Sequence, residues 1–316
     1  MLVYVLFIFG FVLLIKGADY LIKGASALSK KYNVSEIAIG LTVVALGTSL
    51  PEIFVNIFAS LRGEHDLIIG NIAGSNMANL FLVLGVGALI TPLLFSKTSV
   101  RIDVPFALSS VYLLLLLVFS YFFIFGSLVL TRFHGFLFLV AFVVYVFFIF
   151  KRKSKLKEKV ESMPLSHAWT YIVLGSLGLF LGGEFVVSGA VSIAGSFGFS
   201  TLFVGASIIA LGTSLPELVT IIISLSKKKH DFAIGNIIGS NIFNVLLVLG
   251  ISALISPIHF SRAGVFNFLL VAFSMLLLMF FLIKPKLVGG KYVLKSWHGF
   301  VFLVLYISYL FFVFFN

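Results

Sequence analysis

The sequence predicts an all-α integral membrane protein with ten transmembrane helices, arranged as two inverted five-helix repeats. Three observations lead to this fold class: the composition, a series of long charge-free runs, and an internal duplication. Of the 316 residues, 61% are hydrophobic and only 10% are charged, whereas a soluble domain carries roughly 25% charged residues. The composition therefore excludes an ordinary soluble domain and indicates a polytopic membrane protein.

The charge-free runs have the length of membrane-spanning helices. Lys, Arg, Asp and Glu are absent from residues 67–96, 104–131, 133–150, 162–183, 232–261, 263–283 and 296–316. About 20 residues of helix cross a bilayer, whereas the strands of a membrane barrel are about half as long. The pattern predicts helices over 2–28, 36–61, 67–92, 101–125, 132–150, 168–192, 201–226, 232–257, 263–283 and 294–315. The apolar run at the N-terminus is interpreted as the start of the first helix and not as a signal peptide.

Basic residues predict the orientation in the cell membrane. With the N-terminus outside, the loops on the inner side hold 17 Lys and Arg residues, and the outer loops hold only Arg62, Arg132 and Arg262. Cytoplasmic loops carry the excess of Lys and Arg, so both termini are expected outside and the Lys-rich segment 151–159 in the cytoplasm. This topology accounts for the net charge of +11, and no nucleic-acid partner is expected.

A duplicated unit is the strongest organisational signal. Gly40-Leu-Thr-Val-Val-Ala-Leu-Gly-Thr-Ser-Leu-Pro-Glu52 returns 165 residues later as Gly205-Ala-Ser-Ile-Ile-Ala-Leu-Gly-Thr-Ser-Leu-Pro-Glu217, and the segment 69–79 returns at the same offset as 234–244. Five predicted helices separate the copies, an odd number, so the copies have opposite orientations. The predicted organisation is a first repeat over 1–150, a cytoplasmic linker over 151–165 and a second repeat over 166–316. Inverted repeats with Gly- and Pro-interrupted helices are typical of transporters whose site lies between the halves.

Two acidic residues fall near the middle of predicted helices, Glu52 in the first copy and Glu217 in the second. A charge at the bilayer centre costs at least about 2.5–3.5 kcal/mol, so such residues face a partner or an aqueous cavity. No basic residue lies at comparable depth on the surrounding helices, which predicts a bound cation as the partner. The alternatives are a protonated glutamate or an ion pair with Lys16 or Lys23.

Oxygen-bearing side chains accompany both glutamates. Hydroxyl residues precede each glutamate by four and three positions: Thr48, Ser49, Thr213 and Ser214. Pro51 removes a backbone donor, so carbonyls one turn earlier can line a cavity. A second polar series advances four residues at a time along one face of the next helix in each copy: Asn71, Ser75, Asn79, Asn236, Ser240 and Asn244.

For this second series, helix-to-helix packing is an alternative to ion binding. The two interpretations are balanced for Asn71, Asn76, Asn236 and Asn241. A role in the site is favoured for Ser75, Asn79, Ser240 and Asn244.

An all-oxygen donor set of this kind suits a hard cation. Ca²⁺ takes about 6–8 oxygen ligands, and two carboxylates neutralise it, whereas transition metals prefer His or Cys. The chain has no cysteine, and its six histidines lie near the ends of predicted helices. This distribution argues against a transition-metal site and against a Ser-His hydrolase, so no enzymatic activity and no organic cofactor are expected.

The two GTSLPE segments, each followed by a GNxxGSNxxN segment, resemble the two alpha-repeats of the calcium/cation antiporter superfamily, specifically its sodium/calcium exchanger branch of the prokaryotic type. By this resemblance the alpha-repeats cover about 36–92 and 201–257. The resemblance implies a ten-helix fold with a four-helix core, and alternating access by sliding of two long tilted helices, here the first and sixth.

The resemblance also implies roles for the site residues, with Ca²⁺ and Na⁺ as transported ions. Glu52 and Glu217 would be bidentate Ca²⁺ ligands, completed by the carbonyls of Thr48 and Thr213. The remaining positions, implied as flanking Na⁺ sites or as the border of the central site, are Ser49, Ser75, Ser214, Ser240, Asn79 and Asn244. Several relatives have aspartate at the position of Asn244, so this site holds two potential charges and not three.

Two other functions remain as alternatives. A Ca²⁺/H⁺ antiporter could use the same two glutamates, although the neighbouring hydroxyls favour Na⁺. A cation channel could use paired acids as a filter, although an inverted repeat around a central site suits alternating access better. The expected partners are Ca²⁺, Na⁺ and the lipid bilayer, with no obligate protein partner.

Overall fold

The computed structural model describes residues 2–151, 163–196, 212–283 and 289–315. Its helices follow the chain as α1 (Leu2–Tyr32), α2 (Glu36–Ile39), η1 (Gly40–Val44), α3 (Ala45–Thr48), α4 (Leu50–Arg62), α5 (His65–Met77), η2 (Ala78–Val83), α6 (Leu84–Ile90), η3 (Ser99–Asp103), α7 (Val104–Phe125), α8 (Arg132–Phe150), α9 (Leu165–Ser196), α12 (Leu215–Ser226), α13 (His230–Ile242), η5 (Phe243–Val248), α14 (Leu249–Ile255), α15 (Arg262–Ile283) and α16 (Ser296–Phe315), where η marks a π-helical segment. Four short strands complete the fold: β1 (Leu93–Phe95), β2 (Val129–Leu130), β3 (Ile258–His259) and β4 (Tyr292–Leu294).

The protein is an all-helical membrane protein. Seven helical segments of the described ranges are long and apolar enough to cross a membrane, and the bent pair formed by α2 to α3 and α4 makes an eighth. Two shorter apolar helices, α12 and α16, accompany them. Described helix lies within each of the ten predicted ranges. The first part of the predicted helix 201–226, up to residue 211, and residues 152–162 of the predicted linker lie outside the described residues.

The first helix extends beyond the prediction, to Tyr32. Asn33 follows it in the left-handed region, with φ at 52°, and the backbone N–H of Val34 donates to the carbonyl of Ser29 at 3.0 Å. A left-handed asparagine is a common way to end a helix, and the sequence pattern alone does not show where the capping bond forms.

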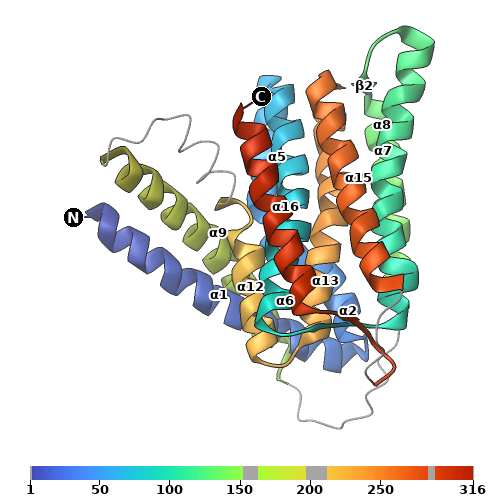
Figure 1. The fold of residues 1–316 in the computed structure, drawn as a ribbon. Helices are drawn as coiled ribbons and strands as arrows, with labels where there is room; N and C mark the ends of the chain where they lie inside the picture. The colour runs from blue at the N-terminus through green and yellow to red at the C-terminus, as the bar shows by residue number, and fades with distance from the viewer. Residues whose placement is uncertain (1, 152–162, 197–211, 284–288, 316) are drawn as a thin grey trace.

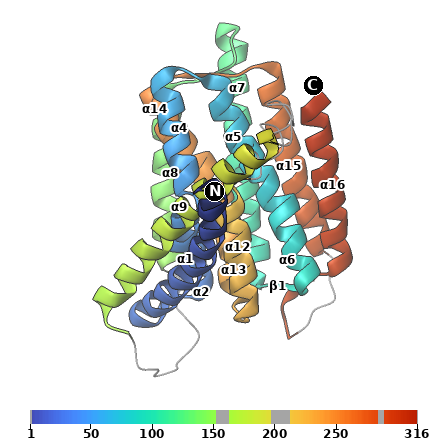
Figure 2. The same ribbon diagram turned by 90° about the vertical axis from the view of Figure 1, so that its left-hand side faces the viewer.

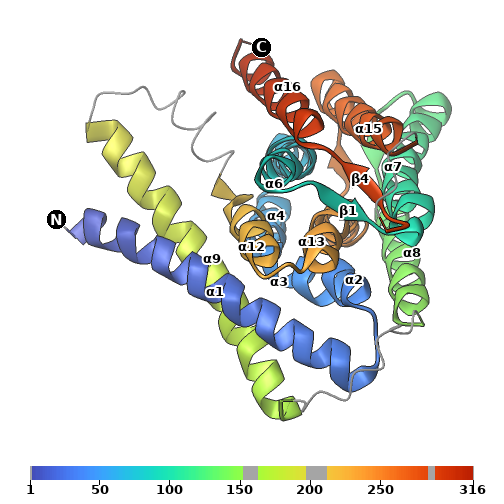
Figure 3. The same ribbon diagram turned by 60° about the horizontal axis from the view of Figure 1, so that its bottom comes forward.

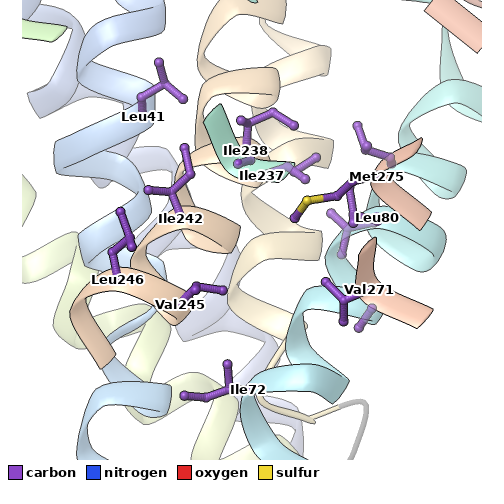
Figure 4. Close-up of a cluster of buried hydrophobic side chains, with 14 of the residues drawn as sticks. Leu41, Ile72, Leu80, Ile237, Ile238, Ile242, Val245, Leu246, Val271 and Met275 are labelled. Atoms are coloured by element: carbon purple, nitrogen blue, oxygen red, sulfur yellow. The ribbon is translucent and has the colours of Figure 1, made fainter. Parts of the chain in front are cut away.

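Two composite helices form the centre of the bundle (Figure 1). In α5–η2–α6 and α13–η5–α14, 78% and 83% of the span residues are buried, against 22% in α8 and 33% in α1 and α9. Apolar side chains of α13, such as Ile238 and Ile242, belong to one buried cluster with side chains from other elements, among them Leu41 of η1 and Met275 of α15 (Figure 4). Polar residues in these central helices are therefore shielded from the lipid by the outer helices.

Glycines allow the second composite helix to approach η1 and α3 closely. A Cβ at Gly239 would lie 2.7 Å from the carbonyl oxygen of Leu41, and one at Gly235 would lie 2.8 Å from that of Ile37. These distances are shorter than any normal contact, so only glycine permits this spacing. Close helix packing is predicted at Gly70, Gly74, Gly235 and Gly239 alike, and the structure confirms it for the last two only, because a Cβ at Gly70 or Gly74 would meet no described atom within 4 Å.

The long helices α1 and α9 lie side by side at the periphery of the bundle (Figures 2 and 3). Their contact also uses glycine, because a Cβ at Gly175 would lie 2.5 Å from the backbone nitrogen of Leu21 and 2.8 Å from the carbonyl oxygen of Gly17. Small residues of this kind let helix backbones approach closely in membranes. The backbones of α1 and α9 therefore approach each other closely at these glycines.

Two antiparallel strand pairs join the halves of the chain at opposite ends of the bundle. Strand β1 pairs with β4, with Leu93 opposite Leu294, and β2 pairs with β3, with Leu130 opposite Ile258. The β1–β4 pair lies at the same end as the α1–α2 and α12–α13 turns, and β2 lies at the other end (Figure 1). The ends of the central helices are therefore held by segments from the opposite half.

Candidate cation site

A break in the second predicted helix positions Glu52. The segments α2 to α3 and α4 meet at an angle of 53°, and Ser49 between them has φ −87° and ψ 14°. The backbone N–H of Ser49 donates to the carbonyl of Ala45 at 3.0 Å, and that of Ile53 donates to Ser49 at 3.1 Å. Pro51 has no N–H to continue the series. The helix is thus broken here, and a new helix starts at Leu50.

The second copy repeats this break. Ser214 has φ −91° and ψ 2°, α12 begins at the next residue with Pro216 in its first turn, and the N–H of Leu218 donates to the carbonyl of Ser214 at 3.0 Å. Consequently Glu52 and Glu217 both lie in the first turn of a helix. The positive end of the helix dipole offsets part of the cost of burying a carboxylate there.

Both carboxylates are buried, with 1% of Glu52 and none of Glu217 exposed. The hydroxyl of Ser49, three residues before Glu52, contacts Glu217, so the two acids lie at one centre. The hydroxyls of Ser49 and Ser240 donate to Oε1 of Glu217 at 3.2 and 3.3 Å. Within the described ranges, neither oxygen of Glu52 nor Oε2 of Glu217 has a hydrogen-bond partner, and no Lys or Arg forms an ion pair with either group. The two acids thus present unpaired oxygens in a buried place.

The hydroxyl groups connect the two copies. Thr48 Oγ1 lies 2.9 Å from Asn236 Oδ1 and 3.4 Å from Ser240 Oγ. The hydroxyl of Ser75 lies 3.3 Å from that of Thr213. Thr48 and Ser75 belong to the first copy, and the groups that they approach belong to the second. Hydroxyls of both copies therefore lie beside one another, whereas the hydroxyl of Ser214 has no partner in the described part of the chain.

The predicted asparagines lie in matching π-helical segments, Asn79 in η2 and Asn244 in η5. Both are fully buried. Asn244 Nδ2 donates to Asn76 Oδ1 at 3.0 Å, whereas the side-chain amide of Asn79 has no partner in the described part of the chain. Single π turns inside α-helices occur frequently at functional sites. The contact between Asn76 and Asn244 is of the kind that helix-to-helix packing by polar side chains would produce.

Sequence reasoning left Asn236 undecided and did not include the polar residues that follow each glutamate. Asn236 lies beside Thr48, as given above. Asn56 donates to the carbonyl of Glu52 at 2.7 Å, and Ser60 donates to the carbonyl of Asn56 at 2.6 Å. Thr220 and Ser224 are fully buried on α12, and their hydroxyls have no partner among the described residues. The sequence could have indicated these residues, because they follow each glutamate at intervals of three or four and so lie on the same face of the helix.

The offset of 165 residues also pairs Asp19 with Glu184, and these two acids lie apart from this centre. Asp19 forms an ion pair at 2.8 Å with Lys23, four residues later on α1, and a second one with Lys227. Glu184 is exposed on α9 and accepts a hydrogen bond from Ser188. Among the described residues, no three His, Cys, Asp or Glu side chains come together as a metal site. The centre at Glu52 and Glu217 therefore depends on hydroxyls, amides and carbonyls beside its two carboxylates.

Comparison with known proteins places this arrangement in a family. The sequence profile of the sodium/calcium exchanger protein family matches residues 2–151 and 167–315. The chain belongs to the sodium/calcium exchanger family. This exchanger is 37% identical to the CaxA protein of Alkalimonas amylolytica over 290 residues, which cover 86% of this chain and 89% of that protein. It is 29% identical to the sodium/calcium exchanger MaX1 of Methanosarcina acetivorans, with 89% of each chain covered.

Solved structures of the sodium-calcium exchanger NCX_Mj have the same fold as this exchanger. A structure of NCX_Mj soaked with 2.5 mM Na⁺ and 0.1 mM Ca²⁺ superimposes with a TM-score of 0.81 at 29% identity, over 98% of this chain and 97% of that one. A structure soaked without Na⁺ and Ca²⁺ gives a TM-score of 0.82, also at 29% identity, over 97% of both chains. The likeness extends over nearly the whole chain. The family is one of cation exchangers, and the expectation of a Ca²⁺ and cation antiporter agrees with it.

Proposed function

We propose that the protein exchanges Na⁺ for Ca²⁺ by alternating access, and that Ca²⁺ binds between Glu52 and Glu217. The observation that carries this proposal is the pair of buried carboxylates with unpaired oxygens and no basic partner in the described part of the chain. A buried charge is stable only when it is paired. One Ca²⁺ balances two carboxylates, and each carboxylate can supply two of the oxygens that Ca²⁺ requires.

The surrounding groups complete an oxygen shell for the transported ions. The carbonyls of Thr48 and Thr213 lie next to the breaks, where regular helical pairing stops, and they would add neutral ligands to Ca²⁺. The hydroxyls and amides would serve Na⁺ at flanking positions and at the border of the centre: Ser49, Ser75, Ser214, Ser240, Asn79 and Asn244. Hydroxyls that hydrogen-bond Glu217 in this structure can turn their lone pairs toward a cation, because a hydroxyl both donates and accepts.

Coupling to Na⁺ and not to H⁺ is supported by this hydroxyl set. Proton exchange needs only the two carboxylates, whereas Na⁺ needs several neutral oxygens around each ion. The contacts of Thr48 with Ser240 and of Ser75 with Thr213 supply such oxygens beside each acid. Because Asn244 adds no charge, two Na⁺ would neutralise the central site.

The proposed architecture is a ten-helix fold of two inverted repeats over 1–150 and 166–316. The breaks at Ser49 and Ser214 and the segments η2 and η5 are separated by the same 165 positions as the sequence copies. The cross-paired strands also support two matched halves. In the proposed orientation, both termini are extracellular and the end that holds the α1–α2 and α12–α13 turns faces the cytoplasm, as does the linker 151–165.

The experiment that tests the coupling is ⁴⁵Ca²⁺ uptake into proteoliposomes of the full-length protein. Three conditions are compared: an outward Na⁺ gradient, an outward H⁺ gradient without Na⁺, and no gradient. We expect accumulation only with the Na⁺ gradient. Accumulation driven by the H⁺ gradient alone would replace the proposal by Ca²⁺/H⁺ antiport, and Ca²⁺ flux that persists without any counter-ion would indicate a channel.

A further inference from the structure

A basic pocket lies apart from the cation site, between α1 and the α12–α13 turn. Its volume is about 300 Å³, and four lysines line it: Lys23, Lys30, Lys227 and Lys229. The pocket is lined by residues of α1 and of the α12–α13 turn, and these elements meet at the end of the bundle that contains the α1–α2 turn (Figure 3), which is the proposed cytoplasmic end. Four ammonium groups around one hollow indicate an anionic ligand.

The carboxylates around this pocket neutralise only part of its charge. Asp19 pairs with Lys23 and Lys227, and Glu36 pairs with Lys229 at 2.7 Å. Lys30 forms no ion pair within the described ranges. Among the described residues, four lysines thus face two acids, and these six side chains keep a formal excess of two positive charges. The side chain of Lys23 is half exposed, so an incoming anion can reach it.

The rest of the lining is apolar apart from one hydroxyl. Ile22, Ala27 and Met163 contribute apolar surface, and Ser26 accepts a hydrogen bond from Lys229 at 2.8 Å. Free phosphate gains nothing from apolar walls, whereas a phospholipid joins its phosphate to a glycerol and acyl chains. Helix α1 lies at the periphery of the bundle, where lipid reaches it (Figure 3). Basic pockets between helices on the cytoplasmic side are a recognised way to bind anionic lipid headgroups.

We propose that this lysine pocket binds the phosphate of an anionic phospholipid headgroup. The phosphate lies between Lys30 of α1 and Lys227 and Lys229 of the α12–α13 turn, and it competes with Asp19 for Lys23 and Lys227. The occupied pocket links α1 to the bundle. Since the proposed function requires α1 to slide, the bound lipid also changes the transport rate, and this consequence alone rests on that function.

Lipid binding is tested without any measurement of transport. The purified, delipidated full-length protein is titrated in detergent with phosphatidylglycerol or with phosphatidylcholine, and bound lipid is counted by native mass spectrometry. Two double variants each remove two positive charges from the same end of the bundle: Lys23→Gln with Lys30→Gln inside the pocket, and Lys31→Gln with Lys97→Gln on exposed positions outside it. Loss of the two pocket lysines is expected to weaken phosphatidylglycerol binding about tenfold or more.

The wild type and the Lys31/Lys97 variant are expected to bind phosphatidylglycerol more tightly than phosphatidylcholine, and the Lys23/Lys30 variant to lose this preference. Equal binding of the two lipids by the wild type would overturn the proposal. So would an equal loss in both variants, because it would assign the effect to overall charge. If the double variant fails to fold, Lys30→Gln alone replaces it, since Lys30 makes no ion pair in the described structure. Binding of inorganic phosphate at millimolar concentration by a wild type that shows no preference for phosphatidylglycerol over phosphatidylcholine would assign the pocket to free phosphate and refute the lipid.

Discussion

Replacing Glu217 by glutamine tests the charge balance of the cation site. Glu217 is fully buried, and the described chain offers it no basic partner. In the Glu217→Gln variant, Ca²⁺ would face only Glu52 and keep one uncompensated charge. Removing one member of a buried charge pair costs about 3–5 kcal/mol, which corresponds to a loss of Ca²⁺ affinity of about 10²- to 10⁴-fold.

The fold of this variant should survive. A glutamine side chain keeps one carbonyl oxygen, which can still accept the hydrogen bonds that Ser49 and Ser240 donate to Glu217. The assay is equilibrium ⁴⁵Ca²⁺ binding to purified protein without Na⁺. A matched control is Glu184→Gln, which makes the same chemical change at an exposed position on α9.

The control should bind Ca²⁺ like the wild type, and Glu52→Gln should behave like Glu217→Gln. Ca²⁺ affinity within threefold of wild type in a folded Glu217→Gln protein would refute the charge argument and the site assignment with it.

Three other predictions concern packing, K⁺ and topology. Gly175→Ala places a methyl group 2.5 Å from the Leu21 backbone and should destabilise the α1–α9 contact by about 1–3 kcal/mol. Gly183→Ala, whose methyl group would lie 3.7 Å from its nearest neighbour, should not destabilise it, and equal melting temperatures of the two variants would contradict this prediction. Na⁺-driven Ca²⁺ uptake by the wild type should not need K⁺, and strict K⁺ dependence would show that the count of charges at the site is wrong. The Asn244→Asp variant should bind cations more tightly but have a lower thermal stability, because aspartate cannot donate a hydrogen bond to Asn76. A single cysteine at Lys31 should be protected from a membrane-impermeant thiol reagent in intact cells, and one at Arg132 should react; the reverse pattern would invert the topology.

The helices and the two acids of the site could be predicted because their signals are local. Charge-free runs report membrane spans directly, and the repeat places Glu52 and Glu217 at matching positions in two helices. The ion pair between Asp19 and Lys23 follows from their spacing of four residues. Lys227, the second partner of Asp19, comes from a turn 208 residues away, and no local pattern can indicate it.

The contacts between the copies could not be predicted, because they depend on how the helices break. On a continuous helix, Ser49 would share a face with Glu52. Since α3 ends at Thr48 and α4 begins at Leu50, the Ser49 hydroxyl instead reaches Glu217 of the other copy. Proline located the break to within two residues, but its angle depends on packing. The π-helical geometry around Asn79 and Asn244 likewise depends on tertiary contacts and not on residue preference.

In the proposed function, Na⁺ and Ca²⁺ compete for the carboxylates of Glu52 and Glu217. The most direct test is equilibrium ⁴⁵Ca²⁺ binding to the purified wild-type protein at increasing Na⁺ concentration, with choline keeping the ionic strength constant. We expect one Ca²⁺ per chain and an apparent dissociation constant that rises with Na⁺ until Ca²⁺ is fully displaced. Ca²⁺ binding that is unchanged at saturating Na⁺ would contradict a shared site.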